Sequence, residues 1–99
     1  YGGDEFMILY SDMAAEEIRR ISEDILREVR KLKMPHECSR CSKYVSVSQG
    51  VFARIPAGNN REWDFTSRAD ELLYRAKNRG RDCVCMSTEK SRDAFVEIK

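Results

Sequence analysis

Two adjacent acidic residues follow two adjacent glycines at the start of the chain, in the pentapeptide Gly2-Gly3-Asp4-Glu5-Phe6. Glycines have no Cβ, so the backbone can turn sharply and approach a polyphosphate closely. Carboxylate oxygens are the protein ligands that Mg²⁺ prefers in phosphoryl-transfer sites. The pentapeptide therefore indicates a nucleotide-binding turn with Asp4 and Glu5 as metal ligands. Taken alone, it favours the alternative of an acidic, solvated β-turn, because short motifs recur by chance.

A second group of polar residues lies near the end of a predicted helix. Asp70 and Lys77 share one helix face, and Arg81 follows Lys77 by four residues, beyond a turn at Gly80. Two cations at a helix end can bind nucleotide phosphates, the arginine as a planar fork and the lysine as a point charge. Ordinary helix-end charges that complement the helix dipole are the alternative.

Four cysteines raise the question of a zinc site. Cys38 and Cys41 have the spacing of a zinc knuckle, and His36 lies close to them in sequence. Cys83 and Cys85 are separated by one residue in a predicted strand, where alternation places both on one face. We favour reduced thiols, two of them packing as small hydrophobic side chains, over zinc and over disulfides.

Two helices are predicted to position these groups. Apolar residues at spacings near 3.6 predict helices over residues 14–33 and 66–78. Ser11 or Asp12 is the expected N-cap of the first helix. Gly80 follows the second helix where a C-cap requires a residue that tolerates positive φ.

Three strands are predicted from apolar runs and alternation, over residues 6–10, 44–52 and 83–86. In the middle strand Gln49 shares a face with three valines. If its amide were buried without a partner, the cost would be about 1 to 3 kcal/mol. Residues 87–99 form a charged tail in which a short extra helix or strand is possible.

The composition describes one small domain or a piece of one. The chain has 99 residues, 41% hydrophobic and 35% charged, and its 18 basic and 17 acidic side chains give a net charge of +1. This balance provides no long-range attraction to nucleic acid or to an anionic membrane. No apolar run approaches the roughly 20 residues that cross a bilayer, so we expect a soluble, cytoplasmic protein. Because the chain begins at Tyr1, directly on its most distinctive motif, we expect an upstream segment to be missing.

Taken in order, these segments resemble the C-terminal part of a GGDEF domain. The resemblance rests on the pentapeptide and on two later segments, Val45-Ser46-Val47-Ser48-Gln49-Gly50-Val51 and Ala69-Asp70-Glu71-Leu72-Leu73-Tyr74-Arg75-Ala76-Lys77-Asn78-Arg79-Gly80-Arg81. It covers residues 1–86 and leaves 87–99 as a C-terminal tail. It implies an α/β fold of the α+β sandwich type, similar to a nucleotidyl-cyclase palm. The expected sheet is mostly antiparallel, with helices packed on it, and is truncated on its N-terminal side.

The resemblance also implies a function in bacterial signal transduction. GGDEF domains are diguanylate cyclase modules that condense two GTP molecules into cyclic di-GMP and release pyrophosphate. Carried over to this chain, Gly2 and Gly3 would approach the GTP phosphates and ribose. Asp4 and Glu5 would act in catalysis and bind Mg²⁺ or Mn²⁺. Contacts to the phosphates would come from Lys77 and Arg81.

The family works with two domains facing each other, each with its own GTP, so the expected partner is a second GGDEF domain in a homodimer. The family's guanine pocket and another metal-binding Asp lie upstream of the position of Tyr1, so we expect the fragment alone to be inactive. The alternative is a degenerate GGDEF domain that binds GTP or a partner protein for regulation. A weaker alternative is a small zinc-binding interaction module built on His36 and the four cysteines.

Overall fold

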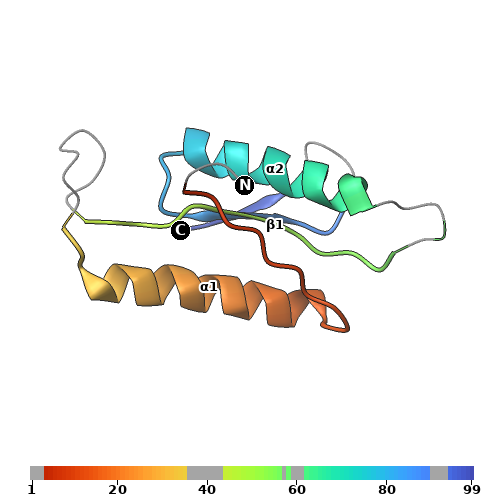
Figure 1. Cartoon of the computed structure of the whole chain (residues 1–99), viewed down its shortest axis with the longest axis horizontal. Helices are drawn as coiled ribbons and strands as arrows, with labels where there is room; N and C mark the ends of the chain where they lie inside the picture. The colour runs from red at the N-terminus through yellow and green to blue at the C-terminus, as the bar shows by residue number, and fades with distance from the viewer. Residues whose placement is uncertain (1–3, 36–43, 57, 59–61, 90–93) are drawn as a thin grey trace.

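The computed structural model describes residues 4–35, 44–56, 58, 62–89 and 94–99. In chain order, its elements are α1 (Ala15–Leu32), β1 (Gln49–Phe52), α2 (Glu62–Asn78), β2 (Val84–Ser87) and β3 (Val96–Ile98). Figure 1 shows the sheet edge-on, with α1 along one face and α2 along the other. The described part of the chain is thus a three-layer sandwich, which confirms the expected α/β fold class.

The three strands are arranged in the order β1-β2-β3. β1 and β2 are parallel, with Gln49 opposite Val84, whereas β2 and β3 are antiparallel. The sheet was expected to be mostly antiparallel, but one of its two described pairings is parallel. The reason is that α2 joins β1 to β2, and a helical crossover returns the chain to the same end of the sheet. β3 extends the sheet from within the predicted tail.

Side-chain alternation along β2 divides the core into two halves. Val84 and Met86 pack on the α1 side, whereas Cys83 and Cys85 pack on the α2 side, so the predicted placement of the two cysteines on one face is confirmed. The buried residues of the α1 half are Ile18, Leu26, Ala53, Val84 and Met86. Those of the α2 half are Leu72, Ala76, Cys83 and Cys85. The sheet is therefore covered on both faces by the two helices.

The prediction of α1 is confirmed to within one residue at each end, but its predicted cap is wrong. The N-cap is Ala14, with no side-chain hydrogen bond, rather than Ser11 or Asp12. Asp12 instead has a φ of 57°, in the left-handed region. An Asp tolerates this conformation better than most residues, so it turns the chain two positions before the N-cap. Glu16 and Glu17 in the first turn still complement the positive end of the helix dipole.

The predicted strand over residues 6–10 is wrong for this structure, in which that stretch belongs to no helix or strand. Its side chains are exposed: Phe6 by 91%, Ile8 by 61% and Leu9 by 87%. A strand is defined by hydrogen bonds to a neighbouring strand, and the described residues offer these five positions none. The apolar composition that suggested a buried strand thus lies on the surface here.

The middle strand is shorter than predicted. Residues 44–52 were expected to be extended as one strand, but only Gln49–Phe52 pairs with β2. The beginning of the segment turns to the chain after α1 instead: Pro35 and Tyr44 form an isolated antiparallel bridge, and the N–H of Val45 donates to the carbonyl of Met34 at 2.7 Å. The last strand is displaced by one residue from the predicted 83–86, to Val84–Ser87.

Gln49 has a partner, so the predicted cost of an unpaired amide does not arise. Its Nε2 donates to the carbonyl oxygen of Ser22 at 3.0 Å, which ties β1 to the middle of α1. The described part of the molecule is elongated, with extents of 46 × 24 × 22 Å. Neither of its two helices combines the length and the apolar composition that crossing a bilayer requires.

Candidate functional site

The C-terminal end of α2 is fixed by a glycine cap. Gly80 has a φ of 110°, and the N–H of Arg81 donates to the carbonyl of Ala76 at 3.0 Å. This bond, spanning five residues, is the Schellman closure of a helix, in which glycine is favoured because positive φ carries no Cβ penalty. The predicted C-cap is confirmed. It fixes the last turn of α2, which carries Lys77.

The turn from α2 into β2 is held from two other elements. The backbone N–H of Asp82 donates to the Oγ of Ser48 at 3.1 Å. Arg30 of α1 donates from Nε to Asp82 Oδ1 at 2.9 Å and from an Nη to its carbonyl oxygen at 2.8 Å. These bonds stabilise a turn in which Arg81 and Asp82 both have positive φ, 63° and 50°. The backbone of Arg81 is therefore tightly positioned, while its side chain is exposed.

One ion pair joins the two sequence motifs. The Nζ of Lys77 lies 2.9 Å from Glu5 Oε2, within hydrogen-bond distance, across 72 positions of sequence. Both side chains are about one third exposed, at 32% and 33%. Glu5 of the pentapeptide and the end of α2 therefore meet at one place on the surface. Helical spacing alone could not predict this contact, because it depends on how the segment before α1 crosses the molecule.

The other predicted site residues are distributed around this pair. Asp4 is exposed directly beside Glu5, and Arg81 lies on the turn just after the helix that carries Lys77. Gly2 and Gly3 lie outside the described residues. The structure thus brings Glu5 and Lys77 into contact and keeps Asp4 next to them, and the binding roles of all six residues stay predictions.

The two neighbouring carboxylates suit a hard divalent cation. Mg²⁺ in phosphoryl-transfer sites is held by one or two protein carboxylates, completed by phosphate oxygens and water. Asp4 and Glu5 supply that number and that chemistry. Among the residues that the structure describes, no group of three or more His, Cys, Asp or Glu side chains is arranged to hold a metal ion. Phosphate oxygens would therefore have to supply part of the coordination.

The structure describes only half of the zinc alternative. Cys83 and Cys85 are free thiols, buried against α2, and His36, Cys38 and Cys41 lie outside the described residues. Burial is the main cause that raises the pKa of Cys85 to about 11, with the Cys83 thiol and the Glu97 carboxylate adding to it. Burial also raises the pKa of Cys83, again with Glu97 contributing. Zinc binds the thiolate, so these raised pKa values disfavour a metal at this pair.

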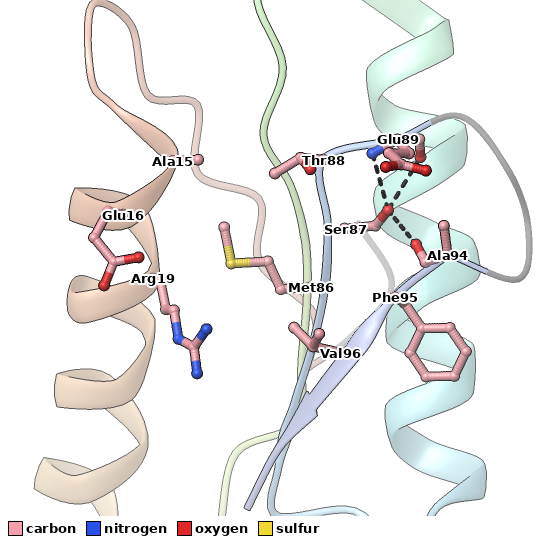
Figure 2. A pocket seen from close by; sticks show the side chains of 10 residues that line it. All are labelled: Ala15, Glu16, Arg19, Met86, Ser87, Thr88, Glu89, Ala94, Phe95 and Val96. Atoms are coloured by element: carbon pink, nitrogen blue, oxygen red, sulfur yellow. Dashed lines mark hydrogen bonds between the residues drawn. The ribbon is translucent and has the colours of Figure 1, made fainter.

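A shallow pocket of about 310 Å³ is lined by the start of α1, the end of β2 and the beginning of β3, and none of its lining residues is a predicted site residue. Figure 2 shows Glu16 and Arg19 of α1 on one side, Met86 and Val96 of the sheet at the back, and the loop after β2 along the rim. Arg19 is held by Glu23, its Nε lying 3.1 Å from Glu23 Oε1. No motif in the sequence indicates this hollow, because it forms where the start of α1 passes the end of β2 and the beginning of β3.

Sequence reasoning also missed Arg68. Its side chain is only 6% exposed and pairs with Glu71 at 3.2 Å. It also donates to the carbonyl oxygens of Glu89 and Ala94, at 3.3 and 3.2 Å. The hydroxyl of Ser87, with one proton to donate, lies within hydrogen-bond distance of the same two carbonyl oxygens and accepts from the N–H of Glu89, as the dashed lines in Figure 2 show. These contacts attach the segment after β2 to α2. An arginine in mid-helix gives no sequence signal of such a role.

The fold and the site together define an α/β domain in which an acidic residue near the start of the chain lies beside a lysine at a helix end. A model of the family described as "Diguanylate cyclase, GGDEF domain" matches residues 1–83. The chain therefore belongs to the GGDEF domain family, as its motifs predicted. The matched range includes the pentapeptide and all of α2, and it ends just before β2.

Curated relatives agree with this assignment. The chain is 36% identical over 84 residues to the response regulator PleD of Caulobacter vibrioides, which covers 85% of this chain and 18% of PleD. It is 35% identical over 85 residues to the diguanylate cyclase VdcA of Vibrio cholerae, covering 85% of this chain and 24% of VdcA. It is 33% identical over 84 residues to the diguanylate cyclase DosC of Escherichia coli, covering 85% and 18%. The chain thus spans less than a quarter of the length of these relatives. No solved structure matches it significantly.

Proposed function

We propose that the protein containing this chain is a diguanylate cyclase, whose GGDEF domain condenses two GTP molecules into cyclic di-GMP. The observation that carries the proposal is the contact between Glu5 of an intact Gly-Gly-Asp-Glu-Phe motif and Lys77 of α2. This contact brings metal-binding and phosphate-binding side-chain types to one place. The relatives VdcA and DosC are themselves named diguanylate cyclases.

In this proposal each residue has a distinct task. Gly2 and Gly3 let the backbone approach the phosphates and ribose of GTP. Lys77 and Arg81 bind the phosphates through charge-assisted hydrogen bonds, and Asp4 and Glu5 hold Mg²⁺ or Mn²⁺. The cation, when bound, supplies neutralisation of the charge that develops on the phosphates. The last turn of α2 and its Schellman closure supply rigid positioning.

The reaction joins nucleotides held by two facing domains of a homodimer. The 3'-hydroxyl oxygen of one GTP forms a bond to the α-phosphorus of the other and loses its proton. The bond from that phosphorus to the β-phosphate oxygen breaks, and pyrophosphate leaves. The same reaction between the 3'-hydroxyl of the second nucleotide and the α-phosphorus of the first closes the ring of cyclic di-GMP and releases a second pyrophosphate. Each domain therefore holds half of the active site, and we propose that these 99 residues alone make no product.

The first test compares the full-length wild-type protein with Asp4→Asn. With GTP and Mg²⁺, we expect the wild type to form cyclic di-GMP and pyrophosphate, measured by chromatography. Asp4→Asn should abolish turnover, because it removes a metal-binding charge from the surface. Its melting temperature should be nearly unchanged, since Asp4 is exposed. Product formation by Asp4→Asn at the wild-type rate would exclude Asp4 from the metal site, and product from the 99-residue chain alone would refute its inactivity.

A second candidate function is that of a degenerate GGDEF domain, which binds GTP or a partner protein without turnover. The exposed side chains of Phe6, Ile8 and Leu9 favour it, because an apolar surface of this kind is typical of an interface. GTP binding by the full-length wild type without product, under the same conditions, would support this function over catalysis.

A further inference from the structure

We propose that the ion pair between Glu5 and Lys77 is a ligand-operated switch. In the ligand-free domain, the carboxylate of Glu5 neutralises Lys77. A nucleotide phosphate displaces this carboxylate and binds the ammonium group of Lys77 in its place. The released carboxylate then becomes available to a divalent cation. This inference rests on the proposed function, because it assigns an order and an energetic coupling to the phosphate and cation sites of the same GTP.

The contact has the geometry that such an exchange requires. Lys77 Nζ lies 2.9 Å from Glu5 Oε2, a charge-assisted hydrogen bond between fully charged groups. About one third of each side chain is exposed, so an incoming phosphate can reach the ammonium group. A phosphate oxygen and a carboxylate oxygen compete for the same N–H donors. A carboxylate oxygen held by the ammonium group is likewise less available to a cation.

The two partners are attached to the molecule very differently. Lys77 follows the fully buried Ala76 in the last turn of α2, which the Schellman closure fixes. Glu5 lies on a stretch that belongs to no helix or strand through residue 10. Glu5 is therefore the partner that can move at lower cost, and Lys77 is the fixed phosphate-binding point.

The strength of the pair sets the size of the effect. A partly exposed ion pair contributes at most about 1 kcal/mol. Because the phosphate must break this pair in order to bind, the pair should lower the affinity of the wild type for metal-free GTP by about two- to fivefold. At 1.4 kcal/mol per tenfold, this corresponds to about 0.4 to 1 kcal/mol. By linkage, phosphate binding strengthens cation binding at Glu5, and cation binding strengthens phosphate binding by the same factor.

The experiment is calorimetric titration of GTP into the full-length protein, first without divalent cations in excess EDTA. Glu5→Gln removes the competing charge and should bind GTP two- to fivefold more tightly than the wild type. Asp4→Asn is the matched control, because it makes the same change of charge one residue away and leaves the Glu5–Lys77 pair intact. Its affinity for GTP should increase less than that of Glu5→Gln. In a Lys77→Met background, titrated at higher protein concentration, Glu5→Gln should not increase the affinity for GTP above that of Lys77→Met alone.

The same titrations with Mg²⁺ should reverse the order, because Glu5→Gln then lacks a cation ligand and binds more weakly than the wild type. Equal gains for Glu5→Gln and Asp4→Asn without metal would overturn the switch, as would a gain that persists in Lys77→Met. Wild-type binding of GTP without any gain in Glu5→Gln defeats the switch and leaves the proposed function standing. Absence of GTP binding by the folded wild type, with or without Mg²⁺, defeats both.

Discussion

Arg81 occupies a backbone conformation that few side chains adopt, with a φ of 63° directly after the glycine cap of α2. Its amide closes the helix, and its side chain extends into solvent near the end that carries Lys77. The backbone role needs an N–H and a residue that tolerates this positive φ, but it makes no use of a guanidinium group. The charge at this position is therefore left to function rather than to the fold.

We expect Arg81→Ala in the full-length protein to weaken GTP binding more than tenfold, because a charge-assisted bond is worth about 1.5 to 3 kcal/mol. The melting temperature should hardly change. Arg79→Ala is the matched control: Arg79 pairs with Glu97 at 3.0 Å and lies over the ring of Phe95, so its loss should lower stability and leave GTP affinity unchanged. Unchanged GTP affinity in Arg81→Ala, together with lowered stability, would show that Arg81 serves only the helix end.

The buried thiol of Cys85 gives a pH dependence. Its pKa in the folded chain is raised to about 11 from an ordinary value near 9.0, mainly by burial. The unfolded chain therefore loses this proton first as the pH rises, so the contribution of Cys85 to stability is constant below about pH 9 and falls between pH 9 and 11, by about 2 kcal/mol at pH 11. Denaturant titrations at several pH values should show a shallower decline for Cys85→Ala. An equal decline in both proteins would contradict this assignment.

Residue identities could be predicted at the site, but their contacts could not. The spacing of Lys77 and Arg81 across Gly80 follows from the helix and its cap, both readable locally. The partner of Lys77 lies 72 residues away, and the partner of Gln49 lies 27 residues away on α1. Such pairs depend on the packing of whole elements. The residue type at any one position of a single sequence does not reveal that packing.

At the scale of elements, both helices were predicted, although α2 begins at Glu62 rather than at residue 66, and two of the strands were not predicted correctly. α1 carries a regular apolar face, with Ile18 and Leu26 buried, and this periodicity is a local property. A strand exists only with a partner. Residues 6–10 have the composition of a strand without a described partner, and the first half of 44–52 pairs with the chain after α1 instead of with β2.

The packing of α2 on β1 depends on Gly50. A Cβ at this position would lie 2.1 Å from the backbone nitrogen of Leu73 and 2.4 Å from the carbonyl oxygen of Ala69. Both atoms belong to the helix backbone, so α2 itself would have to move. We expect Gly50→Ala to reduce the free energy of unfolding by about 3 kcal/mol, at the upper end of overpacking effects.

The control for this change is Gly58→Ala, where an added Cβ meets nothing within 4 Å. Denaturant titration should find its free energy of unfolding within about 0.5 kcal/mol of the wild type. Similar stabilities for the two variants would mean that α2 does not pack on β1 at this distance. Displacement of α2 would also carry Lys77 away from Glu5, so Gly50→Ala should affect GTP binding as well.

At the scale of the whole molecule, the sandwich leaves one apolar stretch uncovered. Phe6 and Leu9 are 91% and 87% exposed, on a segment rich in apolar residues. We expect the 99-residue chain to bind a hydrophobic dye and to self-associate, because soluble proteins rarely expose such a patch without a partner. Leu9→Lys should reduce both effects, measured by dye fluorescence and sedimentation velocity.

The matched control is Ile55→Lys, which replaces an equally exposed residue, at 88%, in the loop after β1. It should leave dye binding and sedimentation nearly unchanged. Equal effects of the two substitutions would indicate a general influence of added charge rather than a specific apolar patch over residues 6–9.

The attachment of the final strand has a consequence for how the sequence of this region can change. In the described part of the segment after β2, Arg68 donates to two main-chain carbonyl oxygens, those of Glu89 and Ala94. Every amino acid carries such an oxygen, so substitutions at 89 and 94 preserve both bonds as long as the backbone keeps its path. Residues 89 and 94 can therefore change in sequence while the segment keeps its place on α2. The side chain on which both bonds depend is Arg68, more than twenty residues upstream.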